Sequence, residues 1–194
     1  MKKIIASLIV VMVGMNANTA IFAANESEDK EDYVNYSIEI EDDVLNDAIV
    51  VSSDTYIKEG RRETVTVYEK TDGTIITDTL SVSAIVARSK NGSDTATRTR
   101  VISGWGRITI TASFKWYTEG LFSYVKCTGM SSSYSLDPKV AVNTWNESYT
   151  TNYVSIGKAK AQVEYFFYNS LIPAQYQEGT FKITCTDAGT ISDT

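Results

Sequence analysis

The body of the chain alternates between hydrophobic and polar residues with a period of two. Every second position is hydrophobic across residues 107–116, and residues 158–167 and 180–185 repeat the pattern. Such alternation places hydrophobic side chains on one face of a β-strand and polar side chains on the other. A half-buried antiparallel sheet has this character, and these three segments are therefore predicted strands.

Further hydrophobic runs predict strands at residues 64–68, 75–88, 95–103, 121–127 and 140–145. Asp72-Gly73 and Asn91-Gly92 carry the residue types of two-residue hairpin loops, and residues 104–106 can reverse the chain through two glycines. Roughly eight short strands without a long amphipathic helix are typical of a sandwich or small barrel. We expect an all-β protein with a single antiparallel β-sandwich at residues 48–194. Residues 42–51 are compatible with either a short helix or an early strand.

The N-terminus has the three-part layout of a signal peptide. Lys2 and Lys3 precede a hydrophobic run at residues 4–15, and small residues follow up to Ala23 and Ala24. This run is too short to span a bilayer. We expect residues 1–23 to be removed after Ala23 and the mature protein to be secreted into the extracellular space.

Charge is unevenly distributed along the remaining chain. Residues 25–47 hold ten acidic residues and one lysine, whereas residues 48–194 are close to neutral. Dense like charge resists burial, so residues 24–47 are expected to form a flexible acidic segment. Calcium binding by Asp42, Asp43 and Asp47 is an alternative, but their spacing does not match an EF-hand loop. No metal is expected.

Composition also limits the chemistry. The 194 residues include no histidine and only two cysteines, which excludes histidine-based nucleophile systems and a closed structural zinc site. Carboxylates alone could serve a glycosidase, yet nothing in the sequence pairs any two of them. Glycine-rich phosphate loops and dense basic stripes are absent from the sequence. We therefore expect no enzyme activity, no cofactor and no nucleic-acid partner.

Cys127 and Cys185 share strand parity with hydrophobic neighbours, so both thiols are expected to face the core. In an oxidising extracellular environment the pair could form a disulfide, which we expect here. The alternative is two buried thiols that pack as small hydrophobic side chains.

Three aromatic residues form the candidate binding site. Trp145, Tyr149 and Tyr153 recur within a polar stretch rich in Asn, Thr and Ser. In an extended segment they would share one face, opposite Val140 and Val142, where flat rings could stack on sugars or anchor a protein. Alternatively, Trp145 fills the core and the tyrosines cap strand ends.

Two resemblances accompany these observations. The order Cys127, Trp145, Cys185 resembles the Cys-Trp-Cys layout of immunoglobulin domains, although Ile183 stands where that family has its corner tyrosine; this implies a sandwich architecture. Residues 121–135 and 179–189 resemble small secreted β-rich proteins of unknown function from Gram-positive bacteria, which implies export and a β-rich fold.

Taken together, the sequence predicts a secreted bacterial protein without catalysis that binds a glycan or a cell-surface protein. The alternative is a small membrane-active toxin or bacteriocin-like effector, because the Ser/Thr-rich residues 74–113 could form amphipathic hairpins in a membrane. A membrane partner is expected only under that alternative.

Overall fold

A computed structural model describes residues 43–84, 90–155 and 157–193. The signal peptide and the acidic segment up to residue 42, including Asp42, lie outside these described residues. A 3-10 turn, η1 (Asp43–Leu45), precedes the strands. The strands are β1 (Ile49–Lys58), β2 (Arg61–Glu69), β3 (Ile75–Ser83), β4 (Gly92–Ile102), β5 (Gly106–Glu119), β6 (Phe122–Leu136), β7 (Val140–Tyr149), β8 (Val154–Ser155), β9 (Lys158–Asn169), β10 (Tyr176–Thr186) and β11 (Ile191–Ser192).

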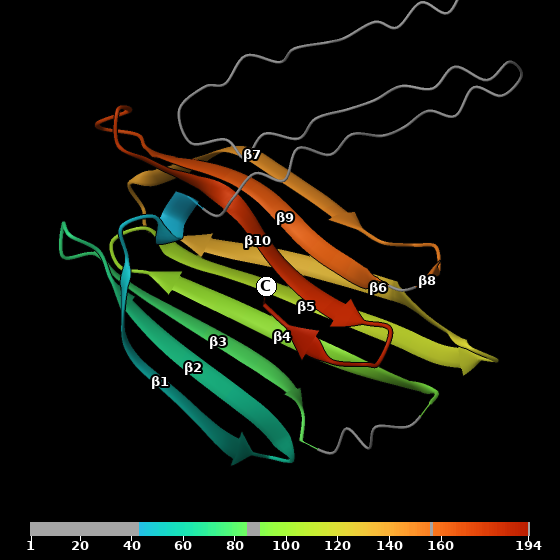
Figure 1. Ribbon diagram of the computed structural model, residues 1–194. Helices are drawn as coiled ribbons and strands as arrows, with labels where there is room; N and C mark the ends of the chain where they lie inside the picture. The colour runs from blue at the N-terminus through green and yellow to red at the C-terminus, as the bar shows by residue number, and fades with distance from the viewer. Residues whose placement is uncertain (1–42, 85–89, 156, 194) are drawn as a thin grey trace, which may run out of the picture. The chain divides into compact units, whose positions relative to one another are not determined.

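These strands form two antiparallel sheets, which confirms the all-β class and supports the sandwich. One sheet has seven strands in the order β1-β2-β3-β4-β5-β6-β8, and the other has four in the order β11-β10-β9-β7. Figure 1 shows β9 and β10 lying across the centre of the larger sheet, while β1 and β2 extend to one side of it. In the described part of the chain, no helix is long and apolar enough to cross a membrane.

The core lies between the sheets and follows the predicted alternation. On β5, Ile108, Ile110, Ala112, Phe114 and Trp116 are buried, and the polar residues between them point to the outer face. β9 and β10 supply the opposing layer through residues such as Val163, Phe167, Phe181 and Ile183. Antiparallel strands with one solvated face produce this arrangement from a period-two sequence.

Two of the three predicted chain reversals are present. Gly73 and Gly104 adopt positive φ values of 81° and 75°, in the turns after β2 and β4. Asn91-Gly92 does not form the expected two-residue loop, because Gly92 is already the first residue of β4. Residues 84–91 instead connect β3 to β4, and residues 85–89 of this connection are not among the residues that the structure describes.

The start of the sandwich includes a strand that hydrophobic periodicity did not identify. β1 is exposed on both faces, so its sequence does not alternate. Its hairpin with β2 turns at Glu59 and Gly60, both with positive φ. Ahead of it, η1 packs against β10 and places Val44 in the core. Residues 42–51 thus contain both a short helical turn and an early strand, and the core begins within the segment expected to be flexible.

A charged cluster lies inside the sandwich. Asp78 on β3 accepts hydrogen bonds from Arg100 Nε at 2.9 Å and Arg98 Nη2 at 2.7 Å, and all three side chains are buried. Arg98 Nη1 also donates to the carbonyl of Lys182 on β10 at 2.8 Å. The Phe181 ring lies beneath both guanidinium groups, 4.5 and 5.0 Å from its centroid. The cluster therefore connects the two sheets.

Candidate functional site

Trp145 packs against the core. Its ring stacks on buried Phe167 with a centroid distance of 6.1 Å and meets Tyr134 edge-on at 4.7 Å. The indole N–H donates to Glu147 Oε1 at 3.2 Å. These contacts agree with the structural alternative for Trp145 rather than with an exposed stacking platform.

A β-bulge explains this position. The register between β7 and β9 shifts between Val142 and Thr144. Val142 lies opposite Phe167 and Trp145 lies opposite Tyr165, and both partners are buried. One extra residue reverses the alternation beyond it, so Trp145 shares the face of Val142 instead of the opposite one.

Tyr149 and Tyr153 are more accessible than Trp145. Tyr149 lies on the same side of β7 as Trp145, as predicted, because the register with β9 is unbroken between them. Tyr149, at the end of β7, is 44% exposed, and Tyr153 is 37% exposed in the connection between β7 and β8. Tyr153 contacts Tyr117 and Lys126 of the larger sheet. Of the three predicted site residues, only Tyr153 therefore joins an aromatic cluster on the outer face.

Replacing Trp145 with Ala is expected to lower the free energy of unfolding by about 1–3 kcal/mol. This partly buried ring loses fewer contacts than a fully buried one, whose truncation costs about 3–5 kcal/mol. Urea denaturation of the variant checks this, with Tyr149→Ala as the exposed aromatic control at about 0.5 kcal/mol or less. Equal, negligible effects of both changes would contradict the packing role of Trp145.

The cluster around Tyr153 is built from neighbouring strands. Tyr117 on β5 pairs with Tyr124 on β6, and their rings stack at 4.9 Å with an interplanar angle of 19°. Tyr153 meets Tyr117 edge-on at 4.8 Å, and Lys126 Nζ lies 4.4 Å from the centre of the Tyr153 ring. We call Tyr117, Tyr124, Tyr153, Lys115 and Lys126 the tyrosine-lysine cluster.

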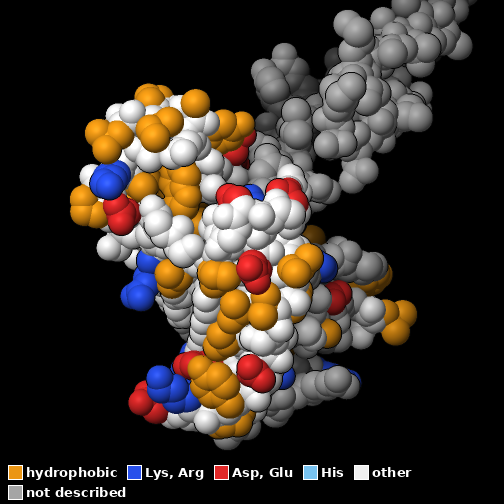
Figure 2. All heavy atoms as spheres, turned by 90° about the vertical axis from the view of Figure 1, so that its left-hand side faces the viewer, with side chains coloured by type: hydrophobic (Ala, Val, Ile, Leu, Met, Phe, Trp, Pro, Cys, Tyr) orange, Lys and Arg blue, Asp and Glu red, His pale blue; other side chains and the backbone are white. Residues whose placement is uncertain are grey.

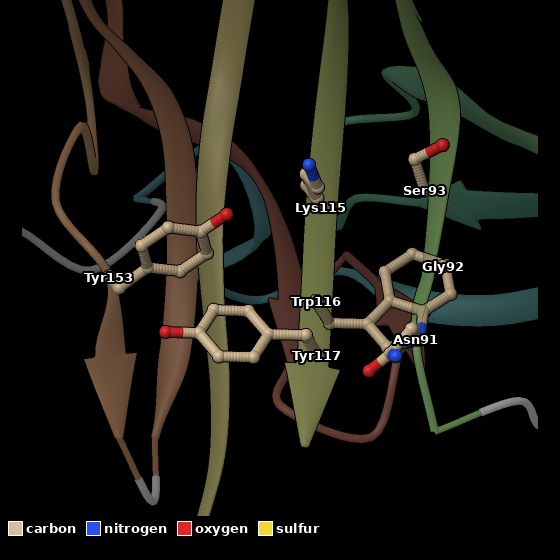
Figure 3. Close-up of a pocket in the computed structure, with 7 residues that line it drawn as sticks. All are labelled: Asn91, Gly92, Ser93, Lys115, Trp116, Tyr117 and Tyr153. Carbon is tan, nitrogen blue, oxygen red and sulfur yellow. The ribbon is translucent and has the colours of Figure 1, made fainter. Parts of the chain in front are cut away.

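A shallow groove of about 550 Å³ adjoins this cluster. Figure 3 shows the rings of Tyr117 and Tyr153 side by side at one wall, while Trp116 turns the other way, towards Gly92. Asn91, Ser93 and Lys115 complete the lining. The Asn91 side-chain oxygen accepts a hydrogen bond from the Thr118 backbone N–H at 3.0 Å. The groove thus combines aromatic surface with hydroxyl, amide and ammonium groups.

The environment of the cluster favours the neutral phenol of Tyr117. Loss of solvent, together with the Glu119 carboxylate and the neighbouring tyrosines, raises the pKa of Tyr117 above its ordinary value. Lys115 and Lys126 lie directly opposite each other on β5 and β6. Like charges in this arrangement are destabilising, so the fold retains a local positive charge here at some cost.

Ser and Thr side chains cover the outer face of β3–β6 next to this cluster. Two rows run across these strands in register, and three β4–β5 pairs are hydrogen bonded: Thr95 with Ser113 at 2.8 Å, Thr97 with Thr111 at 3.1 Å and Thr99 with Thr109 at 3.3 Å. We call this array the hydroxyl lattice; its members are Thr79, Ser81, Thr95, Thr97, Thr99, Thr109, Thr111, Ser113, Ser131 and Ser133.

The expected disulfide is absent, because Cys127 and Cys185 are both free. They are buried as predicted, Cys127 on β6 and Cys185 on β10, in the two facing sheets. Each thiol donates to a carbonyl near it in its own chain segment, Gly129 and Thr186 respectively.

Neither thiol is activated as a nucleophile. Burial raises the pKa of Cys127 above its ordinary value, and burial followed by the charge of Asp94 raises the pKa of Cys185 to about 12. A protonated, buried thiol is a poor nucleophile.

No cluster of three or more His, Cys, Asp or Glu residues suited to a metal ion occurs in the described residues.

The sequence contained a signal for the residues that were missed. The polar face of β5 runs through Thr109, Thr111, Ser113 and Lys115, and the same parity continues to Tyr117. Tyr124 and Lys126 repeat the two residue types on the next strand. An aromatic residue on a solvated face is a stronger indication of binding than one that packs on buried Phe167, as Trp145 does.

No protein-family model, curated protein or solved structure matches this chain.

Proposed function

We propose that this protein is a secreted, non-catalytic module that binds glycans through the tyrosine-lysine cluster. The observation that carries the proposal is the stacked Tyr117–Tyr124 pair with Tyr153 edge-on beside it, on the solvated face of a sheet. Flat aromatic rings offer large contact area at low entropic cost. Sugar rings present C–H faces to such a surface.

The polar groups of the cluster suit the same ligand class. Lys126 provides an ammonium donor beside the Tyr153 ring, Lys115 lies opposite Lys126 on β5, and Asn91 and Ser93 line the adjoining groove. Lysine ammonium groups have three donors and no acceptor, so they match the hydroxyl and ring oxygens of a sugar and any carboxylate that it carries. A rigid sheet holds these groups in place, which limits the entropy lost on binding.

Tyr117→Ala is expected to weaken glycan binding by about 5- to 30-fold, which corresponds to about 1–2 kcal/mol for the loss of one stacking ring. A glycan array identifies the ligand for the mature protein, and isothermal titration calorimetry then gives the dissociation constants. Tyr56→Ala is the matched control, because Tyr56 is exposed on β1 at the opposite edge of the same sheet.

Two results would count against this function. Equal affinities of Tyr117→Ala and the Tyr56→Ala control would remove the cluster as the binding site. No binding on the array, combined with release of dye from lipid vesicles by the wild-type protein, would replace the glycan-binding function with the membrane-active alternative.

A further inference from the structure

We propose that the hydroxyl lattice extends the glycan site into a docking face for the ordered surface of an uncharged, insoluble polysaccharide. This inference rests on the proposed function, since it assigns the polymer class to the same side of the sheet. The tyrosine-lysine cluster contacts individual sugar rings, and the lattice contacts the chains that lie beside them.

The register of four strands makes the lattice two-dimensional. Thr79, Thr99, Thr109 and Ser133 lie opposite one another across β3, β4, β5 and β6. A second row, two residues along each strand, contains Thr97 and Thr111. Neighbouring strands lie about 4.8 Å apart, and residues i and i+2 of a strand about 6.6–6.8 Å apart. A repeating ligand surface, rather than a single small molecule, can match such a grid.

The hydroxyls retain hydrogen-bonding capacity towards a ligand. Each hydroxyl has one donor and two acceptor lone pairs. In the bonded pair Thr97–Thr111, one O–H serves one acceptor, so a second O–H and further lone pairs remain. These threonines are half-buried within the sheet, with their outer sides accessible. Both donors and acceptors are therefore presented, as the hydroxyls of a polysaccharide require.

Charge decides among the polymers. On β3–β6 no charged residue stands within the two central rows. Arg107 lies at one margin, and Glu63 of β2 lies opposite Ser81 at another. The Arg61 guanidinium reaches over the lattice edge, where it donates to Ser81 Oγ at 2.8 Å and to the Thr95 carbonyl at 2.7 Å, so its charge is held by these bonds. A nucleic acid would require phosphate-binding cations across the face. An uncharged partner with many hydroxyls is complementary to the lattice, whereas an acidic polymer would find cations only at its edges.

The lattice and the cluster form one continuous face. Thr109, Thr111, Ser113, Lys115 and Tyr117 follow one another on the outer side of β5, a length of about 26 Å at 3.3 Å per residue. No strand of the other sheet covers this side in the described residues. Its length suits several consecutive sugar units.

The test measures depletion of the mature protein from solution by microcrystalline cellulose, crystalline chitin or granular starch in high salt, which suppresses nonspecific charge binding. The variant Thr97→Val, Thr99→Val, Thr109→Val, Thr111→Val removes four hydroxyls and keeps β-branched shapes. We expect wild-type protein to bind at least one of these solids and the variant to lose at least tenfold in partition coefficient. Its affinity for soluble glycans at the tyrosine-lysine cluster should stay unchanged.

Thr55→Val, Thr64→Val is the matched control, because these two threonines form the same kind of hydroxyl pair, at 3.1 Å, at the β1–β2 edge outside the lattice. It should bind like wild type. A second variant, Ser131→Ala, Ser133→Ala, tests the lattice independently of the threonines. If wild type binds soluble glycans but none of the three solids, or if both lattice variants bind them normally, this inference is wrong and the glycan-binding function stands. Failure to bind soluble glycans as well would overturn both.

Discussion

Replacement of Asp78 with Ala is expected to lower the free energy of unfolding by about 3–5 kcal/mol. The change leaves Arg98 and Arg100 buried without the carboxylate that both contact, at 2.7 and 2.8 Å. Removing one partner of a buried ion pair leaves an uncompensated charge in a medium of low dielectric constant. Asp54→Ala, at an exposed position on β1, is the control and should change stability little.

The ionisation of Asp78 should also shape how the free energy of unfolding falls at acidic pH. Burial alone would raise its pKa, but the hydrogen bonds and charge of Arg100, and then those of Arg98, hold the pKa below its ordinary value. The stabilisation is therefore complete above the unfolded-state pKa of about 3.9 and is lost as the pH falls through the lower pKa of the folded state. Urea denaturation between pH 2 and 7 should show a flatter acid limb for Asp78→Asn than for wild type.

A triple variant separates the cost of leaving buried charges unpaired from the cost of lost side-chain packing. Asp78→Leu combined with Arg98→Met and Arg100→Met removes the charges together and should recover part of the stability lost in Asp78→Ala. Recovery will be incomplete, because Arg98 also donates to the Lys182 carbonyl. If Asp78→Ala is as stable as wild type at pH 7, the cluster does not stabilise the interface between the sheets.

Trp116→Ala is the second change with a large expected effect, and it should lower the free energy of unfolding by about 3–5 kcal/mol. The indole is 3% exposed and fills the end of the core beneath the tyrosine-lysine cluster. Two glycines make room for it: a Cβ atom on Gly92 would lie 2.6 Å from its ring, and one on Gly189 would lie 2.4 Å away. At these distances the backbones of β4 and of the β10–β11 turn pack directly against the indole ring and enclose it on two sides.

A double-mutant cycle tests this enclosure. Gly92→Ala should destabilise the wild-type protein, because the new methyl overlaps a rigid indole. In the Trp116→Ala background the same change should cost little, so the two effects will not add. Gly129→Ala is the control, since a Cβ there meets nothing within 4 Å. Additive effects in thermal or urea denaturation would contradict direct contact between Gly92 and Trp116.

The Asp78 variants lie away from the proposed binding surface, whereas Trp116 and Gly92 also line the groove beside the tyrosine-lysine cluster. Asp78 and Trp116 point into the core, whereas the hydroxyl lattice and the tyrosine-lysine cluster occupy the outer side of the same strands. Exposed hydrophobic side chains also occur elsewhere, on β1 and in the β9–β10 connection, and Figure 2 shows separate hydrophobic groups with charged side chains among them.

The period-two alternation of the sequence was sufficient to predict the central strands of this protein. The hydrophobic residues of segments 107–116, 158–167 and 180–185 are buried on the predicted sides, because a half-solvated strand has to sort its side chains in this way. On β10 the polar side is not solvated as expected, since Thr180 and Thr184 are buried as well. The same rule could not locate β1, whose two faces are both exposed. It also put Trp145 on the wrong face, since a bulge that depends on cross-strand register reverses the alternation.

Tertiary structure alone decided the remaining features. Parity places Arg98 and Arg100 on the core side of β4, but only the approach of Asp78, Phe181 and the Lys182 carbonyl makes burial of two guanidinium groups tolerable. The cysteines face the core as their neighbours predict, but bonding also depends on the distance and orientation that sheet packing gives the two thiols, and here both are free. Sequence determines which side of a strand each residue occupies, because that depends on local geometry. The partners it meets there depend on register and sheet packing, which join residues far apart in the chain.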